Sequence, residues 1–286
     1  MQRSYSMTHT RITVICENRA HMARNIMGEH GFAALVKTPD TCLLMDTGQG
    51  LGLAHNAHAL KIDLFALDGV VISHGHFDHT GGLMQVPAGE SPLPIHAHPD
   101  LFAGKYLVPR DQDPAYIGIP FSQSVLEEKL NARFTFHSRF TEIAPKVFFS
   151  GQVPRTWSFE PSDDRLVIQT PDGYLPDPFA DDASLLIETP AGPVILTGCA
   201  HSGIVNIMEH FAQKSGHQTF HAVIGGTHLG FANDPSQLDQ AMDAFDRFQV
   251  NTIAVSHCTG NEAAARLFHR FKDRFAFAGA GWHMDF

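Results

Sequence analysis

The segment from Val70 to Gly82 constrains the fold and the chemistry of this chain more than any other. It reads VVISHGHFDHTGG, so a short apolar run leads directly into three histidines and one aspartate, followed by two glycines. Such a run favours a strand, and residues two apart on extended backbone face the same side. His74 and His76 can therefore bind one metal ion. If the chain then turns into a helix, Asp78 and His79 point toward a second position nearby.

The residue types in this segment also restrict which metal can bind. Neutral imidazoles with one carboxylate suit zinc, iron or manganese, whereas magnesium and calcium prefer oxygen ligands. A polar loop that is merely rich in histidine is the alternative, but burying unpaired imidazoles and carboxylates is costly. We therefore predict a site for two divalent ions, with Zn²⁺ as the first choice and Fe or Mn as alternatives.

Composition excludes several classes of protein and partner. The 286 residues are 43% hydrophobic and 17% charged, which is typical of a folded globular chain. The formal net charge is −10, so we expect no nucleic-acid surface, which would need a basic stripe. We expect no membrane span, because no apolar run reaches about 18 residues. The first residues lack the apolar core of a secretory signal, which predicts a cytoplasmic protein.

Strand-like and helix-like patterns alternate toward both ends of the chain. Strands are predicted over 12–16, 33–37, 41–45, 69–73, 184–188, 194–197, 222–224 and 252–255, and helices over 50–62, 203–214, 235–248 and 261–275. Asp234 and Pro235 suit the N-cap and first position of the helix that follows them. This alternation predicts an α/β layered fold with helices outside. Residues 275–286 are predicted as a last strand or an interface.

The middle of the chain, from about residue 87 to 178, is less regular. Thirteen of the 17 prolines fall there, and proline breaks long helices and central strands. We therefore expect loops, short helices and edge strands, inserted as a loop or lid region into a single domain of residues 1–286.

The segment HGHFDH matches the HxHxDH signature of the metallo-β-lactamase superfamily. The segments TVICEN, LMDTGQG, HNAHALKID, TGCAHSGIVN, IGGTHL and SHCTG add a resemblance to the subfamily labelled 7,8-dihydropterin-6-yl-methyl-4-(β-D-ribofuranosyl)aminobenzene-5′-phosphate synthase. These matches cover roughly residues 11–82 and 183–286. The resemblance implies a four-layer αββα sandwich with an irregular middle insertion. It also implies two divalent metal ions and a small phosphorylated or pterin-like substrate.

The resemblance also assigns ligand roles. The histidines and aspartate of HxHxDH take the family's first ligand cluster, and His257 takes its final histidine. Cys199 stands where most members place a bridging aspartate, although a small buried residue is the favoured interpretation. The histidine expected ahead of strand 194–197 is absent, and DDASL occupies its place. His201 replaces that histidine, either alone or together with Cys199.

Further residues are candidates for catalysis or for the rim of the site. Asp78 and His228 are the catalytic candidates, and His228 can either contact substrate or serve the structure. Asp46 is expected to orient a ligand or a loop, because metal-bound imidazoles usually donate their other N–H to such a group. His98 and Asp182 are expected at the rim or behind the ligands.

Two bound ions would activate a water molecule and neutralise charge on a phosphate or leaving group. The sequence thus favours a dinuclear metal-dependent hydrolase or transferase. A generic phosphodiester or lactone hydrolase and a non-catalytic metal- or pterin-binding protein are the alternatives. Because the chain is acidic, a phosphorylated substrate needs local positive groups. Lys105 and Arg110 are candidates, although a solvated face is the favoured interpretation.

Overall fold

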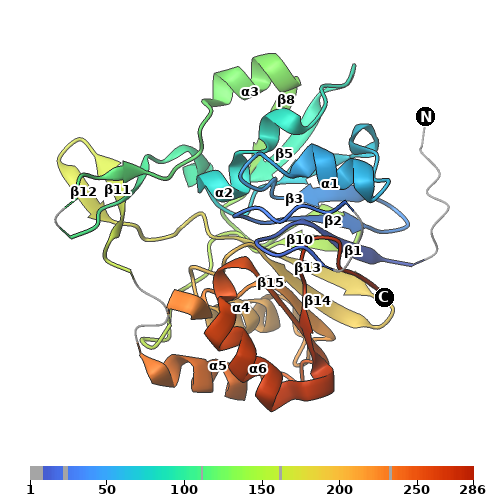
Figure 1. The fold of residues 1–286 in the computed structure, drawn as a ribbon, viewed down its shortest axis with the longest axis vertical. Helices are drawn as coiled ribbons and strands as arrows, with labels where there is room; N and C mark the ends of the chain where they lie inside the picture. Colours follow the sequence, from blue (N-terminus) through green and yellow to red (C-terminus); the bar gives the residue numbers. More distant parts are fainter. Residues whose placement is uncertain (1–8, 22–24, 111, 161–162, 232–233) are drawn as a thin grey trace.

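Two seven-stranded sheets form the centre of the molecule (Figure 1). The computed structural model describes residues 9–286 except 22–24, 111, 161–162 and 232–233. In spatial order, the first sheet contains β18 (His283–Asp285), β1 (Arg11–Cys16), β2 (Ala33–Lys37), β3 (Cys42–Met45), β4 (Gly69–Val71), β5 (Leu93–Ala97) and β8 (Ala132–Phe136). The second contains β17 (Phe275–Phe277), β16 (Thr252–Ser256), β15 (Ala222–Gly226), β14 (Gly192–Thr197), β13 (Ser184–Thr189), β10 (Val147–Phe149) and β9 (Thr141–Ala144).

Six α-helices are described: α1 (Leu53–Ala59), α2 (Phe77–Thr80), α3 (Gln123–Leu130), α4 (Ile204–Ser215), α5 (Pro235–Arg247) and α6 (Asn261–Phe271). Short 3-10 helices cover Leu64–Ala66, Leu83–Gln85, Pro99–Phe102, Leu229–Phe231, His257–Thr259 and Lys272–Arg274. The predicted cap of α5 is present, since Asp234 Oδ1 accepts a hydrogen bond from the backbone N–H of Ser236 at 2.8 Å.

Alternation along the central strands explains the layers. Val71 of β4 faces a core between the two sheets, whereas its neighbour Val70 faces the core beneath α1 and α3. In β14, Val194 and Leu196 face the core between the sheets, and Ile195 faces the core beneath α4, α5 and α6. Helices therefore cover the outer face of each sheet (Figure 1). The predicted four-layer αββα sandwich is confirmed.

The proline-rich middle is more than an insertion of edge strands. It supplies β5 and β8 to the first sheet and β9 and β10 to the second, and β5 and β10 lie inside their sheets. Pro94 is tolerated in β5 because β4 pairs with that strand only at Ile95 and His96. The remaining strands form a separate four-stranded sheet of β12 (Gly173–Pro176), β11 (Leu166–Thr170), β6 (Lys105–Leu107) and β7 (Ala115–Tyr116). A lid role for this sheet stays a prediction.

The C-terminal end departs from the predicted helix over 261–275. Helix α6 ends at Phe271 because Lys272 adopts a left-handed φ of 49°. The chain continues into β17, which pairs parallel to β16, and then into β18 beside β1. Residues 275–286 thus form last strands of both sheets.

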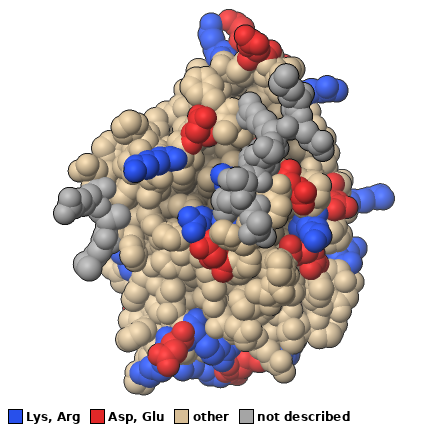
Figure 2. All heavy atoms as spheres, turned by 90° about the vertical axis from the view of Figure 1, so that its right-hand side faces the viewer, with Lys and Arg blue, Asp and Glu red and all other residues tan. Residues whose placement is uncertain are grey.

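Charged side chains of both signs are mixed on the face shown in Figure 2, where Lys and Arg lie beside Asp and Glu. Among the described residues of this face, no continuous basic stripe stands out. Across the part of the chain that the structure describes, we find no helix that combines the length and apolarity needed to cross a bilayer.

Candidate metal centre

The candidate site lies where strands of both sheets end. Helix α2 follows β4 in the first sheet, and the loops after β14, β15 and β16 come from the second. Because β14, β15 and β16 run parallel, their carboxyl ends meet at one edge. The loops there carry Cys199 and His201, then His228, then His257. The predicted site residues, far apart in sequence, are thus brought to one place.

Three buried imidazoles converge to form what we call the first ligand group: His74, His76 and His201. The Nε2 atom of His74 lies 3.0 Å from Nδ1 of His76 and 3.2 Å from Nε2 of His201. One proton cannot serve three converging nitrogens, whereas ligands of a tetrahedral zinc ion lie about 3.3 Å apart. Burial lowers the pKa of His76 to about 3, and it also holds the pKa values of His74 and His201 well below the usual range. All three rings are therefore neutral, as a metal ligand must be.

A second ligand group consists of His30, Asp78 and His257. The Oδ2 atom of Asp78 lies 3.2 Å from Nε2 of both histidines. The Nδ1 atom of His257 is 2.8 Å from Oδ1 of Asn18, and an amide oxygen can only accept. His257 therefore donates from Nδ1 to Asn18, and its Nε2 atom faces the carboxylate of Asp78, on the side where a metal ion would be held.

Cys199 and His79 lie between the two groups. The Nε2 atom of His79 is 3.1 Å from Sγ of Cys199 and 3.9 Å from Oδ2 of Asp78. Burial raises the pKa of the Cys199 thiol well above its usual range. Burial lowers the pKa of His79, but the charges of Asp46 and Asp78 outweigh this and raise it to about 9. The surroundings of His79 thus favour a positive charge, whether a proton or a metal ion.

Asp46 lies behind the ligands and is completely buried. Its Oδ2 atom accepts from Nδ1 of His79 at 2.7 Å and from Oγ of Ser73 at 2.7 Å, and its Oδ1 atom accepts from the backbone N–H of Ser73 at 2.8 Å. The Ser73 Oγ atom is in turn 2.9 Å from Nδ1 of His74. One carboxylate therefore orients two imidazoles that belong to different parts of the site.

The loop of residues 177–182 supports the first ligand group. Phe179 stacks on the ring of His201, with centroids 4.5 Å apart and an interplanar angle of 1°. Asp182 accepts from the backbone N–H of Ser202 at 2.8 Å, and burial raises the pKa of Asp182 to about 6. Asp181 accepts from the backbone N–H of Gly75 at 2.8 Å, between His74 and His76.

Lys105 is not on a solvated face. It is 1% exposed, and its Nζ atom donates to Asp177 at 2.6 Å and to Asp181 at 2.9 Å. A lysine is buried in this way only when it is paired. This contact fixes the four-stranded sheet to the loop behind the first ligand group, so Lys105 is not available to bind a substrate phosphate.

The remaining predicted residues differ in their distance from the ligands. His228 is buried, its ring centroid is 4.3 Å from that of His201, and it forms a close group with Cys199 and His201. His98 instead accepts from the backbone N–H of Asp100 at 3.1 Å and joins neither ligand group. Cys258, the neighbour of His257, donates to the backbone carbonyl of Cys199 at 3.2 Å.

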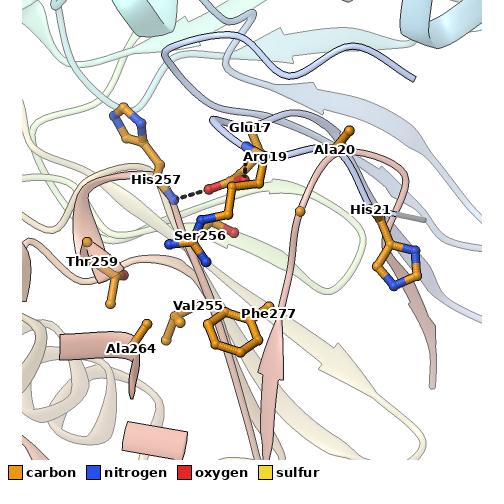
Figure 3. Close-up of a pocket in the computed structure, with 12 residues that line it drawn as sticks. Glu17, Arg19, Ala20, His21, Val255, Ser256, His257, Thr259, Ala264 and Phe277 are labelled. Atoms are coloured by element: carbon orange, nitrogen blue, oxygen red, sulfur yellow. Dashed lines mark hydrogen bonds between the residues drawn. The ribbon is translucent and has the colours of Figure 1, made fainter. Parts of the chain in front are cut away.

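Sequence reasoning missed the residues that surround His257. Glu17 accepts from the backbone N–H of His257 at 2.5 Å, beside a cavity of about 300 Å³ (Figure 3). The His257 ring points away from that cavity in Figure 3. Glu17 and Asn18 end the segment TVICEN, which drew attention only through the family resemblance. His30, a lone histidine before a glycine, has no ligand-type spacing that would reveal it.

The fold agrees with comparisons to known proteins. Residues 27–257 match the sequence pattern of the metallo-beta-lactamase superfamily, and the chain belongs to this superfamily. The family predicted from HxHxDH is thereby confirmed.

Three similar proteins narrow the comparison. A Methanocaldococcus jannaschii protein named 7,8-dihydropterin-6-methyl-4-(beta-D-ribofuranosyl)-aminobenzene-5′-phosphate synthase is 28% identical over an alignment of 291 positions that covers 95% of each chain. An uncharacterized protein of the same organism is 31% identical over 261 residues, covering 90% of this chain and 93% of its own. The crystal structure of a metal-dependent hydrolase of the beta-lactamase superfamily has a TM-score of 0.81 at 28% identity, covering 96% of this chain and 98% of that one.

Proposed function

We propose that this protein is a dinuclear metal-dependent enzyme that acts on a small phosphorylated or pterin-like molecule. The observation that supports this most is the convergence of two ligand groups on one edge of the sandwich. In each group, ring nitrogens or carboxylate oxygens approach one another to 3.0–3.2 Å, which is close to the spacing of ligands around one tetrahedral metal ion. Such an arrangement is costly unless cations occupy it.

The donor set fits zinc, with iron or manganese as alternatives. Imidazole nitrogens predominate, and carboxylate oxygen and thiol sulfur are also within reach. Two divalent ions held here would supply an activated water molecule or stabilise the charge of a phosphate leaving group. Cys199, between the groups, would ligate as a thiolate, since a bound metal ion deprotonates a coordinating thiol.

The chain's own residues suggest where a substrate would be held. Asp78 of the second ligand group and His228, which lies beside Cys199 and His201, are the residues we assign to catalysis. The Nδ1 atom of His228 is buried and has no hydrogen-bond partner among the described residues, so it can contact a bound substrate. The guanidinium of Arg155 lies 5.8 Å from the centroid of the Phe179 ring, where it provides positive charge near the first ligand group.

The substrate class rests on the likeness to the Methanocaldococcus jannaschii synthase, which extends over nearly the whole of both chains. Its name describes a dihydropterin joined through a methyl group to an aminobenzene that carries a ribose phosphate. A phosphate would be compatible with the positive charge of Arg155 near the first ligand group.

A plain metal-dependent hydrolase is the second candidate. The solved hydrolase with a TM-score of 0.81 supports it at the same 28% identity. Such an enzyme would hydrolyse a generic phosphodiester or lactone and would need no second organic substrate.

The decisive experiment begins with metal analysis of protein purified without added metal. We expect two ions per chain, and fewer than one would refute the proposal. The metal-loaded protein is then given a 7,8-dihydropterin whose 6-methyl carbon carries a phosphate leaving group, together with a ribosylaminobenzene phosphate, so that joining the two releases that phosphate. It is separately given a phosphodiester and a lactone. Joining of the first pair supports the synthase, and hydrolysis of either simple ester supports the hydrolase. Tight pterin binding with no turnover in any assay would indicate a non-catalytic binding protein.

A further inference from the structure

His30 contributes to the site from outside the segments that carry the other ligands. It lies in the loop before β2, and its Nε2 atom is 3.2 Å from Oδ2 of Asp78. Its ring centroid is 5.1 Å from that of His257. The His30 side chain is 55% exposed, whereas those of Asp78 and His257 are 11% and 3% exposed. His30 thus lies on the solvent side of an otherwise buried group.

The backbone around His30 is held firmly against the site. Gly31 has a φ of 127°, and a Cβ atom there would come within 2.1 Å of the carbonyl oxygen of Asp78. The next N–H, from Phe32, donates to that same carbonyl at 3.2 Å. Only glycine permits such a φ and such a close approach. The loop is therefore built to bring residue 30 over Asp78.

Asn18 links His30 to His257. Its Oδ1 atom accepts from the backbone N–H of Gly31 at 3.2 Å and from Nδ1 of His257 at 2.8 Å. A single amide oxygen therefore fixes the loop that carries His30 and the tautomer of His257. Outer groups that orient a ligand in this way are typical of metal sites.

We propose that His30 is a fourth protein ligand of the second metal ion, together with Asp78, His79 and His257. This rests on the proposed dinuclear function. The Nε2 atoms of the three histidines all lie near Oδ2 of Asp78, at 3.2 Å for His30, 3.9 Å for His79 and 3.2 Å for His257. Four protein ligands complete the tetrahedron that zinc prefers, whereas the three imidazoles of the first ligand group would leave the fourth position of their ion for a water molecule. His30 supplies the ligand on the solvent side of the second group.

Metal affinity tests the proposal without any assay of activity. The wild type and the His30→Ala variant are titrated with Zn²⁺ against a chelator, with His58→Ala as the control. His58 is also exposed, lies in α1 and belongs to neither ligand group. We expect His30→Ala to lower the binding affinity for one of the two ions by about 10- to 100-fold and to leave the affinity for the other unchanged. Wild-type affinity for both ions in His30→Ala would overturn the proposal.

A second variant guards against a merely structural effect. Glutamate has a similar reach and keeps a ligand atom, so His30→Glu should recover most of the lost affinity. In the Co²⁺-loaded proteins, the ligand-field absorption of the site that loses affinity in His30→Ala should also change in His30→Glu, whereas the absorption of the other site should stay constant. Identical spectra would contradict ligation by His30. If the wild type itself binds fewer than two ions, the proposed dinuclear function fails, a result distinct from both of these.

Discussion

The two ligand groups differ in the charge of their side chains, in their exposure to solvent and in the segments that support them. The first ligand group consists of neutral, fully buried imidazoles and is supported by the loop 177–182. The second ligand group contains a carboxylate, is open to solvent at His30, and is supported by Glu17 and Asn18 near the start of the chain. A cation is therefore drawn to the second group by charge, whereas the first group relies on the geometry of its rings.

The largest expected effect comes from removing a ligand of the first group. In His76→Ala, the two remaining imidazoles carry no charge to hold the ion. We expect one ion per chain to be lost, with an affinity decrease of more than about 100-fold, and turnover to disappear. Elemental analysis of the purified variant measures this. His96→Ala is the matched control, because His96 stacks on His137 and joins neither group. Two ions retained in His76→Ala would show that the groups have been assigned wrongly.

Asp46→Asn should affect both groups at once. The amide nitrogen would replace an oxygen that now accepts from Ser73 and His79, so two donors would face each other. We expect both ions to bind about 10- to 100-fold more weakly, as measured by chelator competition. Asp100→Asn, at an exposed carboxylate 3.8 Å from His98, provides the comparison. A loss confined to one ion would mean that Asp46 orients His79 alone.

Lys105→Met should lower the metal affinity of the first ligand group without changing that of the second. It leaves Asp177 and Asp181 buried without their cation, and breaking a buried pair in this way costs about 3–5 kcal/mol of unfolding free energy. Because Asp181 and Phe179 support the first group, we expect its ion alone to bind roughly 10-fold more weakly. Denaturant unfolding and metal titration measure the two effects. The exposed pair of Lys129 and Glu128 gives the control variant Lys129→Met, which should change neither. Equal weakening of both ions would refute the separation.

The contrast between the groups also explains what the sequence could predict. Most strands and helices were predictable because they carry regular apolar patterns in the sequence. The HxHxDH segment was also recognisable, because it follows one such strand. His201 and His257 follow a similar rule, since His257 comes directly after β16 and His201 lies four residues after the end of β14. The first ligand group therefore lies entirely within reach of sequence reasoning.

The parts that escaped prediction depend on contacts made in three dimensions. His30 lies in a loop, and only the approach of Gly31 to Asp78 brings it to the site. Lys105 resembles a surface residue in sequence, and its burial depends on two carboxylates more than 70 positions away. β5 and β10 were not predicted as central strands because they lie in the proline-rich middle of the chain. β5 tolerates its own proline because the neighbouring strand β4 is short. Such features follow from packing and have no local pattern.

The smallest expected effect concerns the pH dependence of the scaffold behind His201. Glu160 accepts from the backbone N–H of Val205 at 2.5 Å and from that of Asn206 at 3.2 Å, in the first turn of α4. Burial raises the pKa of Glu160 from 4.5 to about 7, although these hydrogen bonds lower it in part. Between these two pH values the folded protein holds a proton that the unfolded chain has lost. Stability contributed by the protonated carboxyl is therefore complete below about pH 4.5 and is lost as the pH rises through 7.

Glu160→Gln should remove this dependence in the metal-free protein. The amide keeps an oxygen acceptor for the helix and cannot ionise. From pH 5 to pH 8 we expect the unfolding free energy of the wild type to fall by about 2.5 kcal/mol relative to that of the variant, since each pKa unit is worth about 1.4 kcal/mol. Urea unfolding at both pH values measures the change, and Glu262→Gln in the first turn of α6 is the exposed control. Because Glu160 supports α4 and not the loop of Asn18, the second ion's affinity should stay unchanged in Glu160→Gln. A parallel change in that affinity would mean that the two groups share one scaffold after all.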